Sequence, residues 1–366
     1  MVNDMIKLGD AATYINGYAF KPEDRGEVGL PIIRIQDLTG NAYDLGFYDG
    51  EYPEKVEIND GDVLISWSAS LGVYVWNRGR ALLNQHIFKV VFDKVDIDKN
   101  YFVYAVRQKL VEMGMKTHGA TMKHIIKKDF DATLIPYPSL NKQAEIATNL
   151  NKVSRVIETR KQEIQLLDVL IKARFVEMFG NPEQNEKGWR TCRLGDECTV
   201  INGRAYKAEE LLDDGKYRVL RVGNFFTNDS WYYSDIELDN DKYCDEGDLL
   251  FAWSASFGPR IWHGEKVIYH YHIWKLIGYE NCLNKDFFVE LLNYNCDVMK
   301  RGTHGSTMLH FTKSQMEDQL LILPPMQLQE QYAGFVHQVD KSKVAVKKAL
   351  DQAQLLFDSL MQKYFG

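Results

Sequence analysis

The sequence predicts an α+β fold with two similar mixed α/β domains, which form a tandem repeat with an offset of 186 residues. Two long helices that form an antiparallel coiled coil are expected to separate the two domains. Three observations predict it. Motifs recur at one constant offset. Each copy opens with short strand-like segments and one helix-like segment. Each copy closes with an apolar heptad pattern.

The repeat is visible from the first residues to the last. Trp67 and Trp253, each followed by Ser-Ala-Ser, lie 186 residues apart. The same offset joins Leu8-Gly9-Asp10 to Leu194-Gly195-Asp196 and the stretch "THGATMKH" to "THGSTMLH". Arg34 matches Arg221 one residue off, which indicates a small loop change. Because one offset spans the chain, the sequence is a tandem duplication.

The first part of each copy, residues 1–140 and 182–326, predicts a mixed domain. The runs "DVLISW" and "GVYVW" read as strands, as do "DLLFAW" and "RIWHG" in the second copy, because they are short and rich in β-branched and aromatic residues. The pattern that ends at Gly114 predicts a helix before a basic loop.

The second part of each copy, residues 141–181 and 327–366, predicts a long helix. Steps of four and three join Ile146, Leu150, Val153, Ile157, Ile164, Leu167 and Ile171, with Arg160 in the one missing place. The counterparts are Tyr332, Val336, Val339, Lys343, Val346, Leu350, Ala353 and Phe357. Two core helices of a larger domain would give this pattern, as would a helix pair that holds two domains apart. The length and repetition of the seam favour the pair.

Composition excludes several classes. With 366 residues and a 45% apolar share, the chain has ample material for packed cores. No run is apolar enough to span a bilayer, and the N-terminus has no secretory pattern. Five cysteines without a Cys-x-x-Cys pair predict reduced thiols and a cytoplasmic protein. The net charge of -7 does not exclude nucleic acid, because a local basic face suffices.

Catalytic signatures are missing from the sequence. It contains neither a phosphate-binding Gly-x-x-x-x-Gly-Lys loop nor a Gly-x-Gly-x-x-Gly motif. Asn181-Pro182 is interpreted as a helix stop, because the second proline and the aromatic of a DNA adenine methyltransferase box are absent. His270 and His272 predict no metal site, since only one of them has a counterpart in the first copy.

Together these motifs resemble the specificity subunit of a type I restriction-modification system. The matching features are "KLGD" near the start, "GDVLISWSASLG", "NQHIFKV", the "THGATM" loop and "IPYPSLNKQAEIA", with "LPPMQLQEQYAGF" in the second copy. One departure is "NKQAEIA", where the family commonly has a Glu-Gln pair.

The resemblance implies that each mixed domain is a target-recognition domain that reads one half of a bipartite, asymmetric site in double-stranded DNA. It implies that the helices dock two modification subunits, which bind S-adenosylmethionine, and that restriction subunits join to cut. This chain itself would hold no cofactor or metal and catalyse nothing. Two rivals stay open: a coiled-coil scaffold whose recognition domains no longer bind DNA, and a DNA-modifying enzyme with an unrecognised catalytic motif.

Candidate DNA-binding residues follow from comparing the copies. Residues shared by both copies suit scaffold or phosphate contacts, which carry no sequence information, whereas residues that differ suit base reading. Trp67 and Trp253 are expected to pack rather than stack on bases. A solvated loop residue is the alternative for each candidate. The candidates in the first copy are Tyr18, Lys21, Arg34, Gln36, Ser68, Ser70, Asn84, Gln85, Lys116, His118, Thr121 and Lys123. Those in the second copy are Arg204, Lys207, Arg221, Asn224, Ser254, Ser256, His270, Tyr271, Thr303, His304, Ser306 and Thr307.

Overall fold

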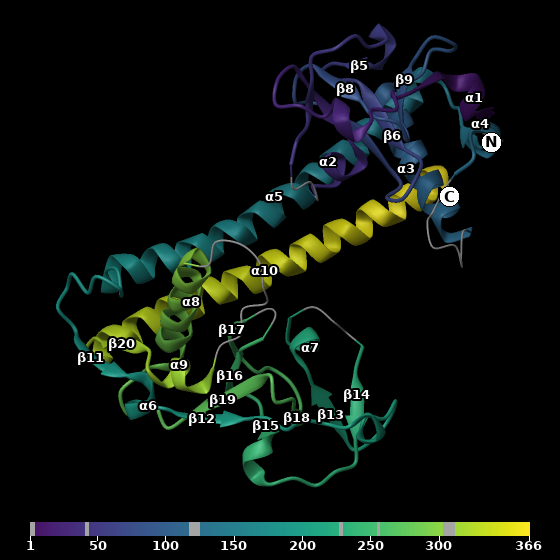
Figure 1. The fold of residues 1–366 in the computed structure, drawn as a ribbon. Coiled ribbons are helices and arrows are strands. Elements are labelled where there is room, and N and C mark those ends of the chain that lie inside the picture. The colour runs from purple at the N-terminus through teal and green to yellow at the C-terminus, as the bar shows by residue number, and fades with distance from the viewer. Residues whose placement is uncertain (1–3, 41–43, 117–124, 227–229, 255–256, 303–311) are drawn as a thin grey trace. The chain divides into compact units, whose positions relative to one another are not determined.

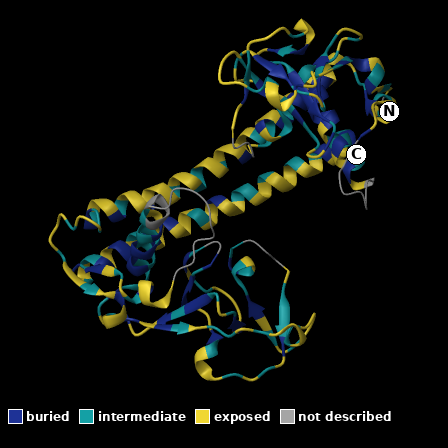
Figure 2. Ribbon diagram, in the orientation of Figure 1, coloured by how far each residue is buried: buried dark blue, intermediate teal, exposed yellow. Residues whose placement is uncertain are grey.

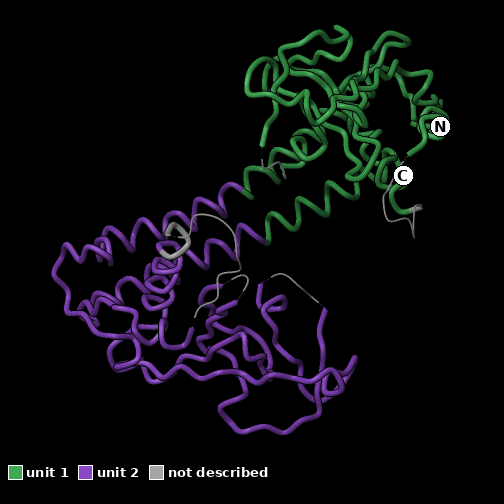
Figure 3. The backbone as a smooth tube through the Cα atoms, in the orientation of Figure 1, with its two compact units in different colours: residues 1–161, 348–366 green, residues 162–347 purple. Residues whose placement is uncertain are grey.

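A computed structural model describes residues 4–40, 44–116, 125–226, 230–254, 257–302 and 312–366 (Figure 1). The chain forms two compact units (Figure 3). Unit 1 comprises residues 1–161 and 348–366, and unit 2 comprises residues 162–347. Each unit therefore contains one recognition-type domain and one part of each long helix.

Unit 1 is a mixed α/β domain with three small sheets. One four-stranded antiparallel sheet has the order β2 (Thr13–Asn16), β9 (Ile87–Val91), β6 (Val63–Ser66) and β7 (Gly72–Val75). A second has the order β4 (Phe47–Tyr48), β3 (Leu30–Ile33), β8 (Ala81–Leu83) and β5 (Glu57–Ile58), and within it β3 and β8 are parallel. Strand β1 (Met5–Lys7) pairs with β10 (Leu134–Pro136). The helices are α1 (Leu8–Ala11), α2 (Ile35–Thr39), α3 (Lys99–Lys116) and α4 (Lys127–Ala132), with 3₁₀ turns η1 (Pro22–Asp24) and η2 (Glu54–Val56).

Unit 2 repeats this topology element by element. Its first four-stranded sheet has the order β12 (Thr199–Asn202), β19 (Ile273–Ile277), β16 (Leu249–Ala252) and β17 (Gly258–Ile261). The second has the order β14 (Tyr232–Ser234), β13 (Tyr217–Leu220), β18 (Val267–Tyr269) and β15 (Tyr243–Cys244). Strand β11 (Arg190–Arg193) pairs with β20 (Leu320–Leu323). The helices are α6 (Leu194–Glu197), α7 (Val222–Phe226), α8 (Lys285–Gly302) and α9 (Lys313–Glu317), with η3 (Ala208–Glu210) and η4 (Asn240–Lys242). The predicted tandem repeat of a mixed domain is confirmed.

The repeated tryptophans have a packing role. Trp67 stacks on Phe88 with ring centroids 5.5 Å apart, and Trp253 stacks on Trp274 with centroids 5.7 Å apart. Both tryptophans are half-buried against the core of their own unit. The shared aromatic pair thus supports the fold of both units, as expected of a residue kept in both copies.

The second part of each copy forms a single long helix, as predicted. Helices α5 (Leu140–Phe179) and α10 (Met326–Phe365) are 40 residues each, which corresponds to about 60 Å at 1.5 Å per residue. The heptad residues are buried or half-buried, and most of the remaining helix surface is exposed (Figure 2).

The two helices are antiparallel within each unit. In unit 2, Phe179 at the end of α5 packs on Tyr332 near the start of α10, and Asp168 pairs with Lys343 at 2.7 Å. In unit 1, Leu150 of α5 shares a core with Met361 of α10. The predicted antiparallel coiled coil is confirmed on these contacts.

A buried glutamine ties each long helix to its own domain. Gln143 and Gln329, matched by the repeat, both have 0% exposure. The side chain of Gln143 accepts from the Asp98 backbone N at 2.9 Å and donates to the Pro138 carbonyl at 2.8 Å. These bonds fix the start of α5 against the residues that precede α3.

Gln329 makes the same kind of link in unit 2. It accepts from the Asn284 backbone N at 2.8 Å and donates to the carbonyls of Cys282 and Pro324 at 3.0 and 2.8 Å. A buried carboxamide with all its partners orients the helix, because any rotation would break bonds that water cannot replace.

Candidate nucleic-acid interface

The repeat brings three separate loops together in each unit. In unit 1, Tyr18 and Asn84 form an isolated β-bridge, and the Asn84 backbone N donates to the Ile33 carbonyl at 3.0 Å. Arg34 follows Ile33 directly, so it lies beside this bridge. The candidates at positions 18, 34 and 84 therefore share one site.

Unit 2 uses the same frame. Arg204 and His270 form the matching bridge, and the His270 backbone N donates to the Leu220 carbonyl at 2.9 Å, directly before Arg221. A repeated glycine permits the close approach. A Cβ on Gly203 would lie 2.4 Å from the His270 carbonyl oxygen, and one on Gly17 would lie 2.1 Å from that of Asn84.

In unit 1 this frame borders an open cavity of about 370 Å³. Predicted residues from three loops line it, namely Arg34, Gln36, Ser70, Asn84 and Gln85. The sequence-based comparison missed four further lining residues, Ile35, Thr39, Ala69 and His86. His86 is identical to its counterpart His272, so a comparison of the two copies gives no sign that it differs in function from the scaffold.

The cavity lining carries backbone strain. Ala69 has φ = 57° and His86 has φ = 72°, in the left-handed region that residues with a Cβ rarely adopt. The Nδ1 atom of His86 is also buried and has no hydrogen-bond partner among the described residues. Strained backbone and an unpaired polar atom concentrate at functional sites, so the cavity is the strongest binding candidate of unit 1.

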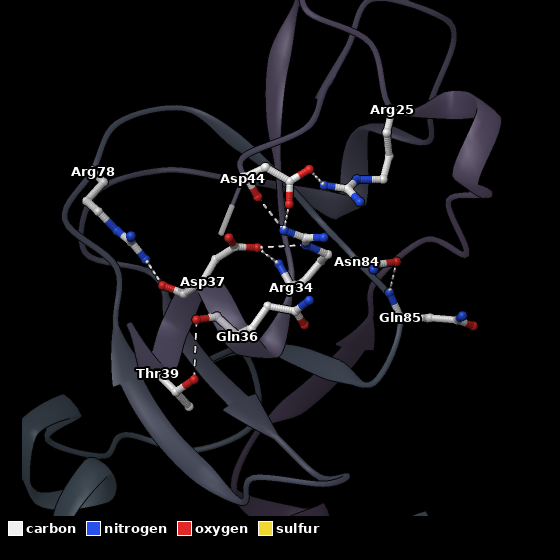
Figure 4. A network of polar contacts seen from close by, with 9 residues as sticks. All are labelled: Arg25, Arg34, Gln36, Asp37, Thr39, Asp44, Arg78, Asn84 and Gln85. Carbon is white, nitrogen blue, oxygen red and sulfur yellow. Dashed lines mark hydrogen bonds and ion pairs between the residues drawn. The ribbon is translucent and has the colours of Figure 1, made fainter. Parts of the chain in front are cut away.

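The arginine at this site is neutralised in unit 1. The Arg34 Nε atom donates to Asp37 at 3.1 Å, and the guanidinium lies 3.6 Å from the Asp44 carboxylate (Figure 4). Asp37 is buried and also accepts from the Arg34 backbone N at 2.8 Å. Arg78 donates to the Asp37 carbonyl at 2.9 Å, and Arg25 pairs with Asp44 at 3.0 Å (Figure 4).

The chemistry at the matched positions differs in unit 2. Arg204 forms a bidentate pair with Glu210 at 2.9 and 2.7 Å. These bonds, and one from the Lys207 backbone N, lower the pKa of Glu210 to about 2. Arg221 instead lies over the ring of Tyr232 with 4.3 Å between the guanidinium carbon and the ring centroid.

An aromatic and imidazole cluster borders Arg221. The rings of His270 and Tyr271 are 4.4 Å apart, and those of Tyr271 and His272 are 4.0 Å apart. Burial, followed by the charges of His272 and Arg221, lowers the pKa of His270 to about 4. His270 is therefore neutral near pH 7 and presents a hydrogen-bonding ring rather than a charge.

The remaining predicted residues have varied surroundings. Lys21 and Lys207 are exposed. Ser68 and Ser254 are buried, so little of either hydroxyl reaches solvent. The Asn224 side chain donates to the Ser230 carbonyl at 2.6 Å. The side chain of Lys116 and the residues His118, Thr121, Lys123, Ser256, Thr303, His304, Ser306 and Thr307 lie outside the described part of the structure.

The described residues contain no group of three or more His, Cys, Asp or Glu side chains arranged to hold a metal ion. Among the same residues no helix is both long and apolar enough to cross a bilayer. All five cysteines are free thiols.

Comparisons with known proteins agree with the geometry. Residues 3–168 and 186–354 match the family model of the type I restriction modification DNA specificity domain. The EcoBI specificity subunit of Escherichia coli is 28% identical over 170 residues, which are 46% of this chain and 35% of that protein. The MjaIX specificity subunit of Methanocaldococcus jannaschii is 22% identical over 94% of this chain and 91% of its own length. The chain thus spans about a third of the first relative and nearly all of the second.

Two solved structures share the fold. One is the S subunit of a type I restriction-modification system from M. genitalium, with a TM-score of 0.55, 17% identity and coverage of 99% of this chain and 96% of that one. Another comes from work on complex assembly and conformational transition of a type I system, with a TM-score of 0.59, 16% identity and coverage of 100% and 98%. Because both copies of the repeat match the family model, this chain belongs to the family of type I restriction-modification DNA specificity subunits.

Proposed function

We propose that each unit reads one half of a bipartite, asymmetric site in double-stranded DNA, and that this chain gives a type I restriction-modification complex its specificity. One observation carries the proposal. The same backbone frame occurs twice, with equivalent bridges and repeated glycines, but it presents Asn84 and Gln85 in unit 1 and His270 and Tyr271 in unit 2. A shared frame with different polar groups suits two readers of different sequences.

The long helices dock two modification subunits in this proposal. Exposed apolar pairs support it. Val169 and Leu170 on α5 are 60% and 46% exposed, and their repeat counterparts Leu355 and Leu356 on α10 are 70% and 50% exposed. Such pairs on the face away from the seam suit burial against a protein partner. Their duplication supports two copies of one partner.

Chemistry belongs to the partners in this proposal. The modification subunits bind S-adenosylmethionine and methylate DNA, and restriction subunits join them to cut. This chain holds no cofactor of its own, catalyses nothing and works in the cytoplasm. Methyl transfer by the purified chain alone, supplied with S-adenosylmethionine, would contradict this part and would favour the modifying-enzyme alternative.

Domain exchange tests the reading of two half-sites. The full chain is assembled with its modification subunits, and methylated sites are sequenced before and after residues 1–140 are replaced by those of a relative. One half of the target should change while the other half and the gap between them persist. A complex that assembles but shows no DNA preference would favour the scaffold alternative.

Charge substitution tests the docking surface. Leu170→Glu and Leu356→Glu should each reduce the number of modification subunits bound per chain from two to one, measured by light scattering of the complex. Gln184→Glu is the matched control, because it adds the same charge at an exposed loop position. Two bound subunits in both leucine variants would place docking elsewhere.

A further inference from the structure

We infer that the two units read different bases at the matched position: Arg221 contacts a guanine in the half-site of unit 2, whereas the carboxamides of Gln36 and Gln85 contact an adenine in the half-site of unit 1. The inference rests on the proposed function and adds the identity of the readers. It follows from which polar groups the fold leaves available.

Arg34 and Arg221 occupy equivalent places. Each directly follows the end of an inner strand, β3 or β13, whose last carbonyl accepts from the residue at position 84 or 270. The backbone presents both arginines in the same way, so the difference between them comes from their neighbours.

The guanidinium of Arg34 is held by ion pairs within the protein. It pairs with Asp37, which is only 6% exposed, and withdrawing the guanidinium would leave a buried carboxylate without its charge partner. Asp44 adds a second negative charge 3.6 Å away. A base would have to compete with two carboxylates for the donors of Arg34, so this arginine orders the loop rather than reading DNA.

Arg221 has no such carboxylate partner among the described residues. The residue in the place of Asp37 is Asn224, which carries no charge. Arg221 forms no ion pair with any residue that the structure describes, and its Nε atom has no hydrogen-bond partner there. Tyr232 contacts the face of the guanidinium, which leaves the in-plane N–H groups for another acceptor. A planar fork of donors matches the O6 and N7 acceptors of guanine.

Unit 1 presents carboxamides instead. Gln36 and Gln85 are exposed, line the same cavity, and hydrogen-bond to no described residue through their side chains. The Asn84 side chain is less available, because its Oδ1 accepts from the Gln85 backbone N at 2.8 Å. A free carboxamide offers one donor and one acceptor, which match N7 and N6 of adenine. Unit 2 has Gly223 and Tyr271 in these places and cannot make the same contact.

The test uses the full chain assembled with its modification subunits. Methylation is measured on a library of duplexes in which each position of both half-sites is randomised. Arg221→Ala should reduce the preference for guanine at one position of one half-site by about 5- to 150-fold, the discrimination typical of one bidentate contact. Arg221→Gln should shift the preference at that position toward adenine.

Matched variants separate the two units. Gln36→Ala and Gln85→Ala should weaken an adenine preference in the other half-site and leave the guanine position intact. Arg193→Gln is the control within unit 2, because it removes an exposed arginine that pairs with Asp318 at 3.3 Å away from the site, and it should change no preference. Thermal unfolding of every variant verifies that the units remain folded.

Two results would overturn the inference. One is a wild-type bipartite preference that Arg221→Ala and Arg221→Gln both leave unchanged at every position while the complex stays folded. The other is a change in the same half-site from the glutamine and the arginine variants. Neither would touch the proposed function, which fails only if the wild-type complex itself shows no sequence preference.

Discussion

Replacing the buried glutamine of unit 2 provides a quantitative test of how the long helix is held. Gln329→Leu keeps a similar volume, so the cavity contribution is small, but it removes the partner of three backbone groups, those of Asn284, Cys282 and Pro324. Each buried group left unpaired costs about 1–3 kcal/mol. The free energy of unfolding of unit 2 should therefore fall by about 3–9 kcal/mol, less whatever relaxation recovers.

The matched substitution in unit 1 sets the scale. Gln143→Leu leaves two backbone groups, those of Asp98 and Pro138, without a hydrogen-bond partner. The free energy of unfolding should therefore fall by about 2–6 kcal/mol, which is less than for Gln329→Leu. Denaturant unfolding of the full chain measures both variants, and amide hydrogen exchange identifies which unit loosens. Gln331→Leu is the control on the exposed face of α10, with an expected change within about 0.5 kcal/mol. If Gln329→Leu costs no more than Gln331→Leu, the glutamine does not anchor the helix.

Three further predictions concern pH, salt and length. In the folded protein His270 has a pKa of about 4, below its ordinary value of 6.5. The unfolded chain therefore binds a proton that the folded chain does not, and unit 2 should lose stability as the pH falls from about 6.5 to about 4. The substitution His270→Asn, which introduces the residue of the first copy, should flatten this pH dependence in urea unfolding, and an unchanged dependence would exclude His270 as its source. Lys116→Ala and Lys123→Ala should each reduce the salt slope of DNA binding by nearly one, as for a lost phosphate contact, whereas an unaltered slope would mean that these lysines face away from DNA. Adding seven residues after Arg160, with a matching insertion in α10, should lengthen the helices by about 10 Å and widen the gap between half-sites; methylome sequencing that finds the same gap would refute the spacer role.

The sequence alone predicts the architecture of this protein. The offset that joins Trp67 to Trp253 indicates two copies, and the strand and heptad patterns predict the elements of each copy. These features are readable because periodicity and repetition are properties of neighbouring or equally spaced residues. The same comparison singled out positions 18, 34, 36, 84 and 85, and the structure places them around one site.

Only the tertiary structure decided which of these groups is available. Arg34 and Arg221 look alike in the sequence, yet the first is held by buried Asp37 and by Asp44, and the second lies over Tyr232. The strained turns at Ala69 and His86 left no sequence signal, because both residue types are ordinary and both are shared by the copies. Asp37 is close to Arg34 in the sequence, but Asp44 and Tyr232 are not neighbours of their arginines, and no local pattern in the sequence encodes how close the fold brings them.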